Sequence, residues 1–355
     1  VHVYITGLDD AGQVIMMNTA LQLEVLTTSS SSPQTLSNAD FAIPLPSELT
    51  IPGYISSCRI WFAVGYLNFS VVATADGAGL VAPTSVNPTD PSHDVNWGFV
   101  ELTYTSDGLW ADISYVDFVG LPLGLSMTPV SGPVQSAPGL PANGVQEVCS
   151  KLQAQAASDG QPWDQLCIND SSGNLIRVNS PGSLLPSNPD AFEDLFTAYS
   201  NSVWSYYSTN TLYFNTQNSN GNVSCTVQGG ELTCEGDNRG YAQPTAADIF
   251  SCASGPFEIL SGDNDIHLAV VPRLCAAFNR ATFLLPGGNY QPNLPPSSYY
   301  TVQPNNEYSA MVHEVEIDGK GYAFPYDDVT PSEGDDVAGF VAAADPSSMT
   351  VILGG

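Results

Sequence analysis

The segment from residue 97 to residue 122 constrains the fold of this chain more than any other part of the sequence. Apolar and polar residues alternate over residues 99–105, the turn-forming dipeptide Asp107-Gly108 follows, and the alternation then resumes. Successive side chains of a strand point to opposite faces, so this pattern predicts a β-hairpin with one buried face. The residues expected on the buried face of its first strand are Val100, Leu102 and Tyr104.

Two acidic residues of this segment, Glu101 and Asp117, are the candidate catalytic groups. If Asp107-Gly108 forms a two-residue loop, Glu101 faces Ser114, and the Cα atoms of Glu101 and Asp117 lie about 11 Å apart. That spacing suits an inverting glycosidase, whose carboxylates stand about 6.5–9.5 Å apart to leave room for a water. Strict alternation would turn Asp117 to the opposite face, so the prediction requires a β-bulge or a strand end before it.

The candidate substrate contacts near the two acids are Thr103, Thr105, Trp110, Asp112 and Ser114. An exposed indole can stack on a sugar ring, and a hydroxyl can hydrogen-bond to one. Structural readings compete: Trp110 could pack against Tyr104, Thr103 is a favoured strand residue, and Asp112 could be a surface acid. Two carboxylates beside an aromatic platform are what cleavage of a polysaccharide requires.

This segment resembles glycoside hydrolase family 64, the β-1,3-glucanases whose fold is related to thaumatin-like proteins. The resemblance covers residues 99–103, Trp110, residues 114–122 and the sixteen-residue separation of Glu101 and Asp117. Two further blocks extend it toward the C-terminus: Asp318-Gly-Lys-Gly-Tyr-Ala-Phe-Pro-Tyr-Asp-Asp-Val329 and Leu274-Cys-Ala-Ala-Phe-Asn-Arg280.

The resemblance implies that Glu101 is the general acid, that Asp117 is the general base and that the product is the inverted anomer. Thr103 and Trp110 match positions that contact glucan, whereas Thr105 stands where bacterial members have an asparagine. The implied activity is that of a secreted endo-type β-1,3-glucan hydrolase that releases short laminari-oligosaccharides without a cofactor or metal. The alternative is a non-catalytic thaumatin-like protein for glucan binding or defence, which has no need of the Glu101 and Asp117 pair.

Helix-like patterns occupy the middle of the chain. They follow a Pro/Gly-rich stretch at residues 128–144 and end before a second Pro-rich stretch at residues 286–304. The expected helices are residues 145–152, a segment from Asn188 with an apolar stripe that reaches Val203, and residues 272–283.

Strand-like runs occupy both ends of the chain. The expected N-terminal strands are residues 1–5, 21–25 and 59–64, and the expected C-terminal strands are residues 310–313, 321–324 and 349–353. We therefore expect a mostly β protein with a mixed α/β insertion. Residues 1–128 and 306–355 would form a thaumatin-like β barrel or sandwich that carries the catalytic hairpin, and residues 129–305 a mixed α/β domain. The substrate groove would lie between the two domains, as the family resemblance also implies.

The charge of the chain limits its partners. Seven Lys and Arg residues against 36 Asp and Glu residues give a net charge of −29, which repels nucleic acid and anionic membranes. A neutral glucan needs no basic patch, and high acidity suits solubility in an acidic extracellular medium. The chain begins at Val1 without a methionine, as a processed secreted form would, and it contains no apolar run of the roughly 20 residues that span a membrane. We expect a monomer.

Cysteine usage also favours secretion. Cys225 and Cys234 flank a hairpin centred on Gly229-Gly230 and are expected to form a disulfide. Proximity suggests the further pairs Cys149–Cys167 and Cys252–Cys275, although sequence alone does not fix the connectivity. Cys58 is left over and is expected to be a buried apolar thiol. N-glycosylation triplets occur at three positions: Asn68, Asn169 and Asn222.

Two adjacent acids, Asp327 and Asp328, could line an acidic groove or bond to the backbone of a turn, and the structural role is favoured. Arg273 and Arg280 are expected to pair with acids within the insertion, because the chain has so few cations.

Overall fold

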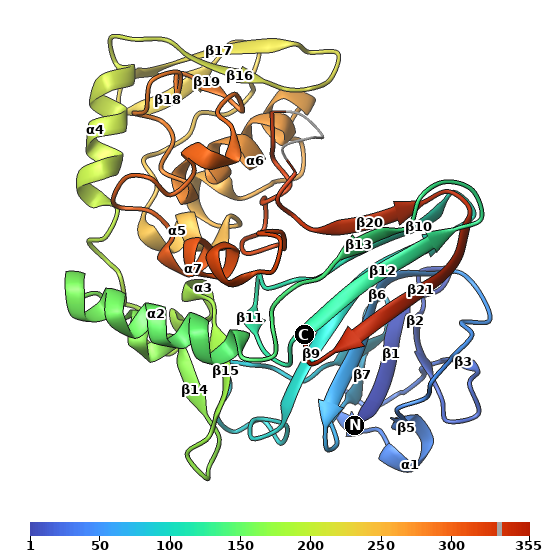
Figure 1. Cartoon of the computed structure of the whole chain (residues 1–355). Coiled ribbons are helices and arrows are strands. Elements are labelled where there is room, and N and C mark those ends of the chain that lie inside the picture. Colours follow the sequence, from blue (N-terminus) through green and yellow to red (C-terminus); the bar gives the residue numbers. More distant parts are fainter. Residues whose placement is uncertain (332–335) are drawn as a thin grey trace.

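The structure is a computed structural model that describes residues 1–331 and 336–355. Its largest sheet has eight strands in the order β20-β10-β9-β6-β1-β2-β3, with β5 paired to β1 (Figure 1). Their bounds are β1 His2–Leu8, β2 Val14–Met17, β3 Leu23–Val25, β5 Ile43–Pro44, β6 Ile55–Val64, β9 Asn96–Thr105, β10 Gly108–Asp112 and β20 Phe340–Ala343. All pairs in this sheet are antiparallel. Because β20 follows the helical part of the chain, the sheet joins both ends of the sequence.

The two faces of this sheet bury different cores. One face buries Val100, Leu102 and Val341 beside a three-stranded sheet, β13-β12-β21. The other face buries an aromatic cluster around Trp61 and Phe99, beside the sheet β4-β7-β8. The strands of these smaller sheets are β4 Gln34–Thr35, β7 Ser70–Thr74, β8 Gly77–Val81, β12 Leu123–Pro129, β13 Gln135–Ala137 and β21 Pro346–Leu353.

The expectation of a mostly β protein is confirmed, but a barrel is not found. Within the described ranges, the eight-stranded sheet runs from edge strand β20 to edge strand β3 without closing on itself. The smaller sheets cover parts of its faces, which gives an open, layered arrangement instead.

The middle of the chain combines helices with two small sheets, β11-β15-β14 and β18-β17-β16-β19. The α-helices that follow residue 143 are α2 Gly144–Asp159, α3 Pro181–Leu184, α4 Thr197–Tyr207, α5 Ala246–Ser251, α6 Asp265–Asn279 and α7 Glu307–Val315. Helix α1, Asn38–Phe41, lies in the N-terminal part of the chain. Among the described residues, short 3-10 helices lie at Trp163–Leu166, Gly255–Phe257 and Pro296–Ser298. The strands are β11 Phe118–Val119, β14 Cys167–Asn169, β15 Leu175–Asn179, β16 Leu212–Asn215, β17 Asn222–Gln228, β18 Glu231–Cys234 and β19 Tyr290–Gln291. In the part of the chain that is described, no helix is both long and apolar enough to cross a bilayer.

Two of the expected helices begin elsewhere. The segment from Asn188 runs through turns, with Phe192 at a φ of 64°, and α4 begins only at Thr197. Helix α6 begins seven residues before Pro272, where the Asn264 side chain accepts a hydrogen bond from the backbone N–H of His267. A capping side chain thus determines that start, and Pro272 lies inside the helix.

Two of the expected C-terminal strands are wrong. Residues 310–313 belong to α7, which Asn306 caps by accepting a hydrogen bond from the Ser309 N–H. Tyr308, Val312 and Val315 are buried at the spacing of one helical face. Residues 321–324 form turns, and their one strand-like contact is a bridge between Tyr322 and Ser114. The third expected strand, at residues 349–353, is confirmed as part of β21.

All three expected disulfides are confirmed. They join Cys149 to Cys167, Cys225 to Cys234 and Cys252 to Cys275, and Cys58 is free and buried. The three bridges therefore lie within residues 149–275, and none crosses the eight-stranded sheet.

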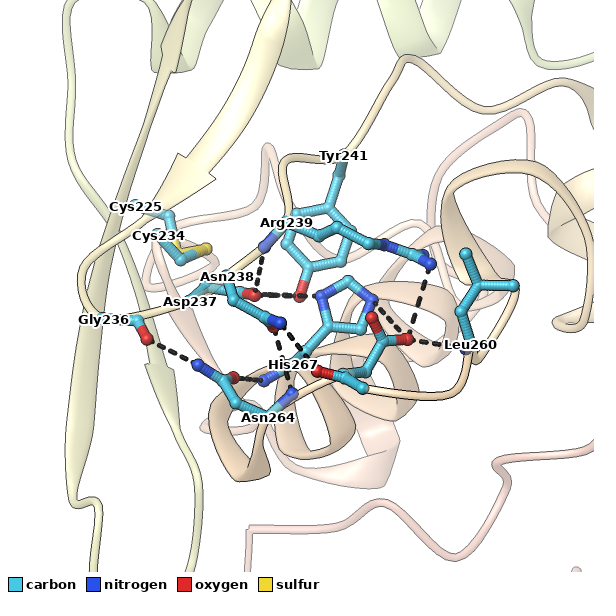
Figure 2. A network of polar contacts seen from close by, with 12 residues as sticks. Cys225, Cys234, Gly236, Asp237, Asn238, Arg239, Tyr241, Leu260, Asn264 and His267 are labelled. Atoms are coloured by element: carbon cyan, nitrogen blue, oxygen red, sulfur yellow. Dashed lines mark hydrogen bonds and ion pairs between the residues drawn. A yellow bond between two sulfur atoms is a disulfide. The ribbon is translucent and has the colours of Figure 1, made fainter.

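A buried polar network anchors the loop after the Cys225–Cys234 hairpin to α6 (Figure 2). The Asp237 carboxylate accepts the Tyr241 hydroxyl at 2.5 Å and contacts His267 Nδ1 at 3.0 Å. The Tyr241 ring stacks on the His267 ring, with centroids 4.9 Å apart. The His267 and Asp237 side chains are fully buried, so the centre of this network fastens the loop to the helix away from solvent.

Candidate active site

The turn of the hairpin lies one residue earlier than expected. Gly108 pairs with Thr105, so the loop residues are Ser106 and Asp107. A side chain on Gly108 would collide with β20, because its Cβ would lie 2.4 Å from the Ala343 carbonyl oxygen, and Gly108 has a φ of 131°. A glycine is therefore needed in the strand and not in the loop.

This shift changes the partner of Glu101. The prediction that Glu101 faces Ser114 is wrong, because Asp112 lies directly opposite Glu101 in the β9–β10 pair. The expected faces are nevertheless confirmed: Val100 and Leu102 are buried, and Glu101 and Thr103 lie on the other face. Two carboxylates, Glu101 and Asp112, thus lie side by side on that face.

Arg59 connects the two candidate catalytic acids. It lies opposite Glu101 in the β6–β9 pair, and its Nε is 2.8 Å from Glu101 Oε1. Its Nη2 is 3.5 Å from Asp117 Oδ2. The guanidinium carbon of Arg59 lies 4.2 Å from the centroid of the Phe99 ring, so the guanidinium makes a cation–π contact with this ring. One cation therefore holds the carboxylates of Glu101 and Asp117 near each other.

Asp117 reaches this position because the strand ends before it. Strand β10 stops at Asp112, and residues 113–117 follow an irregular path, as the prediction required. The Tyr115 N–H donates to the Tyr322 carbonyl at 2.7 Å, and the Tyr308 hydroxyl donates to the Tyr115 carbonyl at 2.6 Å. The Asp117 carbonyl accepts a hydrogen bond from the Ser180 N–H at 3.0 Å. The segment is therefore held at Tyr115 by Tyr308 and Tyr322, and at Asp117 by Ser180.

Beside Glu101 the sheet is hollowed into a pocket of about 410 Å³. Its lining includes Ser57, Arg59, Glu101, Thr103, Trp110 and Asp112. Trp110 pairs with Thr103, and 46% of its surface is exposed. Three of the five predicted contacts, Thr103, Trp110 and Asp112, are thus brought together with Glu101.

Thr105 and Ser114 lie elsewhere. Thr105 is next to the turn, where its hydroxyl accepts the Asp107 N–H at 3.2 Å. Ser114 is buried and bridges to Tyr322.

The environment favours the protonated form of two carboxyl groups. Burial, together with the negative charges of Glu101 and Asp328, raises the pKa of Asp112 to about 7, against the opposing positive charge of Arg59. Burial also raises the pKa of Asp117, against the opposing charge of Arg59. Asp112 therefore retains its proton in mildly acidic solution.

The adjacent acids Asp327 and Asp328 have different surroundings. Asp327 is fully buried, where its carboxylate contacts Arg280 at 2.9 Å and His313 at 2.8 Å and accepts the Ala323 N–H. This agrees with the favoured structural role. Asp328 is exposed, and burial of part of its carboxyl group raises its pKa. Among the described residues, no group of three or more His, Cys, Asp or Glu side chains is placed to hold a metal ion.

Arg59 is the residue that the sequence interpretation missed. It lies in a predicted strand, residues 59–64, and it is one of only seven cations in the chain. A lone arginine in a strand, in so acidic a protein, was the available signal.

The fold is similar to that of solved β-1,3-glucanase structures. A laminaripentaose-producing β-1,3-glucanase in complex with laminaritetraose superposes with a TM-score of 0.85 at 24% identity, over 99% of this chain and 93% of that one. A β-1,3-glucanase domain from Clostridium beijerinckii superposes with a TM-score of 0.75 at 22% identity, over the same shares of the two chains.

Sequence comparison leads to the same group of proteins. Glucan endo-1,3-β-glucosidases from Cellulosimicrobium cellulans and from Arthrobacter sp. strain YCWD3 are 25% and 24% identical over 285 residues, which is 78% of this chain. The chain spans about half the length of these curated relatives, 49% in each case. The family model for β-1,3-glucanases matches residues 1–353. The chain therefore belongs to glycoside hydrolase family 64, the β-1,3-glucanase family.

Proposed function

We propose that this chain cleaves internal β-1,3-glucosidic bonds of a glucan, with Glu101 and Asp117 as its catalytic carboxyl groups. The observation that carries the proposal is the contact of both carboxylates with Arg59, at 2.8 Å and 3.5 Å, beside the pocket. Two relatives in the family are glucan endo-1,3-β-glucosidases, which supports an endo-type reaction on this linkage.

We propose single displacement with inversion. Glu101 gives its proton to the departing glycosidic oxygen while Asp117 takes a proton from the water that attacks the anomeric carbon. Glu101 Oε1 and Asp117 Oδ2 both contact the planar guanidinium of Arg59, so these two oxygens are at most about 9 Å apart. This limit is compatible with the spacing of roughly 6.5–9.5 Å between the carboxylates of inverting enzymes. The assignment of acid and base follows the family resemblance.

The remaining pocket residues would orient the sugar. Trp110 offers an apolar face to one glucosyl ring, and Thr103 offers a hydroxyl. Asp112, which retains a proton in mildly acidic solution, can donate a hydrogen bond to a sugar oxygen. Thr105 would contact sugar at the turn end of the hairpin. We assign the buried Ser114 to positioning residues 113–117 rather than to direct binding.

We further propose that the protein acts outside the cell as a monomer and releases short laminari-oligosaccharides. Its three disulfides suit an oxidising compartment, and its charge of −29 suits a neutral polysaccharide partner. We retain the relation to thaumatin-like folds and the division into residues 1–128 with 306–355, and 129–305, as part of this proposal.

The test compares the wild-type protein with Glu101→Gln and Asp117→Asn on linear β-1,3-glucan. The activity of both variants should fall about 100- to 10,000-fold, while both remain folded and still bind glucan. Proton NMR of early wild-type product should show the α-anomer. On a substrate whose leaving group needs no proton, such as a laminaribiosyl fluoride, Glu101→Gln should recover activity and Asp117→Asn should not.

Two results would contradict the proposal. Early β-anomer would rule out inversion, whereas binding without any release of sugar between pH 3 and pH 8 would favour the non-catalytic glucan-binding alternative. Recovery by Asp117→Asn instead of Glu101→Gln would exchange the two roles.

A further inference from the structure

A row of paired residues leads from the candidate catalytic site to the edge of the sheet. Arg59 pairs with Glu101, Glu101 pairs with Asp112, and Asp112 pairs with Phe340 on β20. Residues directly opposite each other in an antiparallel sheet have their side chains on the same face. Phe340 therefore lies on the pocket face, next to Asp112, on the edge strand that Figure 1 shows beside β10.

Phe340 is unusually open for a phenylalanine in a sheet. Its neighbours Val341 and Ala343 are buried on the opposite face, whereas 48% of the surface of Phe340 is exposed. On the same face, Ala342 lies opposite Trp110, and its small side chain leaves the indole uncovered. Trp110 and Phe340 are diagonal neighbours across β10 and β20, a relation that places their Cα atoms about 7–8 Å apart. We call Trp110, Ala342 and Phe340 the aromatic ledge.

The aromatic ledge is held rigidly although β20 is an edge strand. The Gln135 side chain donates from Nε2 to the Ala342 carbonyl at 2.6 Å, and its Oε1 accepts the Ala342 N–H at 2.9 Å. The backbone groups in the middle of the strand are thus satisfied by one side chain of β13. A binding surface fixed in this way loses little conformational entropy when a ligand binds.

We propose that Phe340 is a sugar-binding residue, which takes a second glucosyl ring of the glucan chain whose bond is cleaved beside Glu101. This rests on the proposed function. A β-glucosyl ring carries its hydroxyls at the equatorial positions, so its faces present C–H groups that suit an aromatic surface. The phenyl ring has no hydrogen-bonding group, so it selects a neutral ring face and not a charged sugar.

The position of Phe340 fits a neighbouring ring rather than the reacting one. Two strand spacings separate Glu101 from Phe340, about 10 Å in all. This distance exceeds the width of one pyranose ring. Phe340 thus contributes to binding of longer chains and takes no part in proton transfer.

The experiment measures hydrolysis of laminari-oligosaccharides of increasing length by wild type, Phe340→Ala and Phe340→Trp. Phe340→Ala should raise KM for long oligosaccharides and for polymer about 2- to 10-fold, the loss expected of one aromatic contact, with kcat little changed. The effect should fade for the shortest cleavable oligosaccharides, and Phe340→Trp should restore wild-type KM. Tyr206→Ala is the matched control, since Tyr206 on α4 is 47% exposed and lies in the helical part of the chain.

The outcomes separate this inference from the proposed function. If wild type hydrolyses glucan and Phe340→Ala matches both wild type and Tyr206→Ala at every length, the ledge proposal is wrong and the catalytic proposal stands. A fall in kcat at all lengths, without rescue by Phe340→Trp, would also overturn it, since that indicates a structural role. If wild type neither binds nor cleaves glucan, the proposed function fails and the ledge proposal fails with it.

Discussion

At the scale of single residues, Arg59 holds the two candidate catalytic acids in position. Its guanidinium contacts Glu101 and Asp117 and lies over the Phe99 ring. A planar guanidinium can contact two carboxylates at once, which the point charge of a lysine does not reproduce. Burial raises the pKa of Asp117, and the positive charge of Arg59 limits this rise. Arg59 thus supports the ionised form of the base and fixes its position.

We predict that Arg59→Met lowers kcat/KM about 10- to 100-fold, because the carboxylate of Asp117 loses its positioning contact. Loss of the positive charge should raise the pKa of Asp117, so the acidic limb of the pH–activity profile should move to higher pH. Lys151→Met is the matched control, since Lys151 and Arg59 are both 35% exposed and Lys151 pairs with Glu314 at 2.7 Å. Lys151→Met should have the same kcat/KM and the same pH–activity profile as wild type, since exposed ion pairs contribute little to stability. An unchanged acidic limb in Arg59→Met would contradict this account.

The candidate site shows which single residues a sequence can reveal. Glu101, Thr103 and Trp110 followed from strand alternation, because that period is local. The pairing of Glu101 with Asp112 did not follow, since it depends on the close approach of β20 to Gly108. Arg59 was missed because its contacts span 42 and 58 residues of sequence, which alternation within one strand cannot connect.

At the scale of elements, the path of Asp117 depends on α6, α7 and the loop after them. Tyr322 of that loop exchanges backbone hydrogen bonds with residues 113 and 115. The loop is fixed by Asp327, which contacts Arg280 at the end of α6 and His313 on α7. His313 also contacts Glu316 at 2.9 Å. A buried ionic cluster of four side chains, Arg280, His313, Glu316 and Asp327, therefore supports the segment that carries the proposed base.

We predict a stability change with pH that originates in this cluster. The charges of Asp327 and Glu316 raise the pKa of His313 from 6.5 to about 10, against the effect of burial. The folded state therefore binds a proton that the unfolded state releases above pH 6.5, so the stabilisation is complete below that pH and is lost as pH rises toward 10. His313→Gln should lower the free energy of unfolding by about 2–4 kcal/mol near pH 6.

Urea unfolding at pH 6, 8 and 10 measures this effect. The difference between wild type and His313→Gln should shrink steadily as pH rises. His2→Gln is the control, because His2 lies on β1 in the N-terminal part of the chain, outside the buried ionic cluster. A His313→Gln difference that does not change with pH would show that His313 is not charged in the folded protein.

Prediction of the elements succeeded where the pattern is local. Strands β1, β6 and β21 followed from alternating or apolar runs. Residues 310–313 were misread because Ala-Met-Val-His is too short to show a helical period, whereas the cap at Asn306 and the buried Tyr308 and Val312 define α7. The start of α4 was misread because the apolar spacing continues through Phe192, whose positive φ no apolar pattern reveals.

At the scale of the whole molecule, the two proposed domains are stabilised differently. The N-terminal part has a separate aromatic core around Trp61 and Phe99 and a long antiparallel ladder through β1, β6 and β9. The disulfides all lie within residues 149–275. A second core, which includes Val100 and Phe278, continues through both parts and couples them.

We predict that reduction of the disulfides loosens residues 129–305 before the large sheet. The bridges span 18, 9 and 23 residues, and each contributes about 2–4 kcal/mol by restricting the unfolded chain. Hydrogen exchange of the reduced and alkylated protein should show faster amide exchange in α5, α6, β17 and β18, with protection retained in β6 and β9.

Alkylation without reduction is the control: burial raises the pKa of Cys58 to about 12, so its thiol should not react and exchange should be unchanged. An equal loss of protection in β6 and β9 would mean that the shared core dominates, that the chain unfolds as one cooperative unit, and that its division into two domains is wrong.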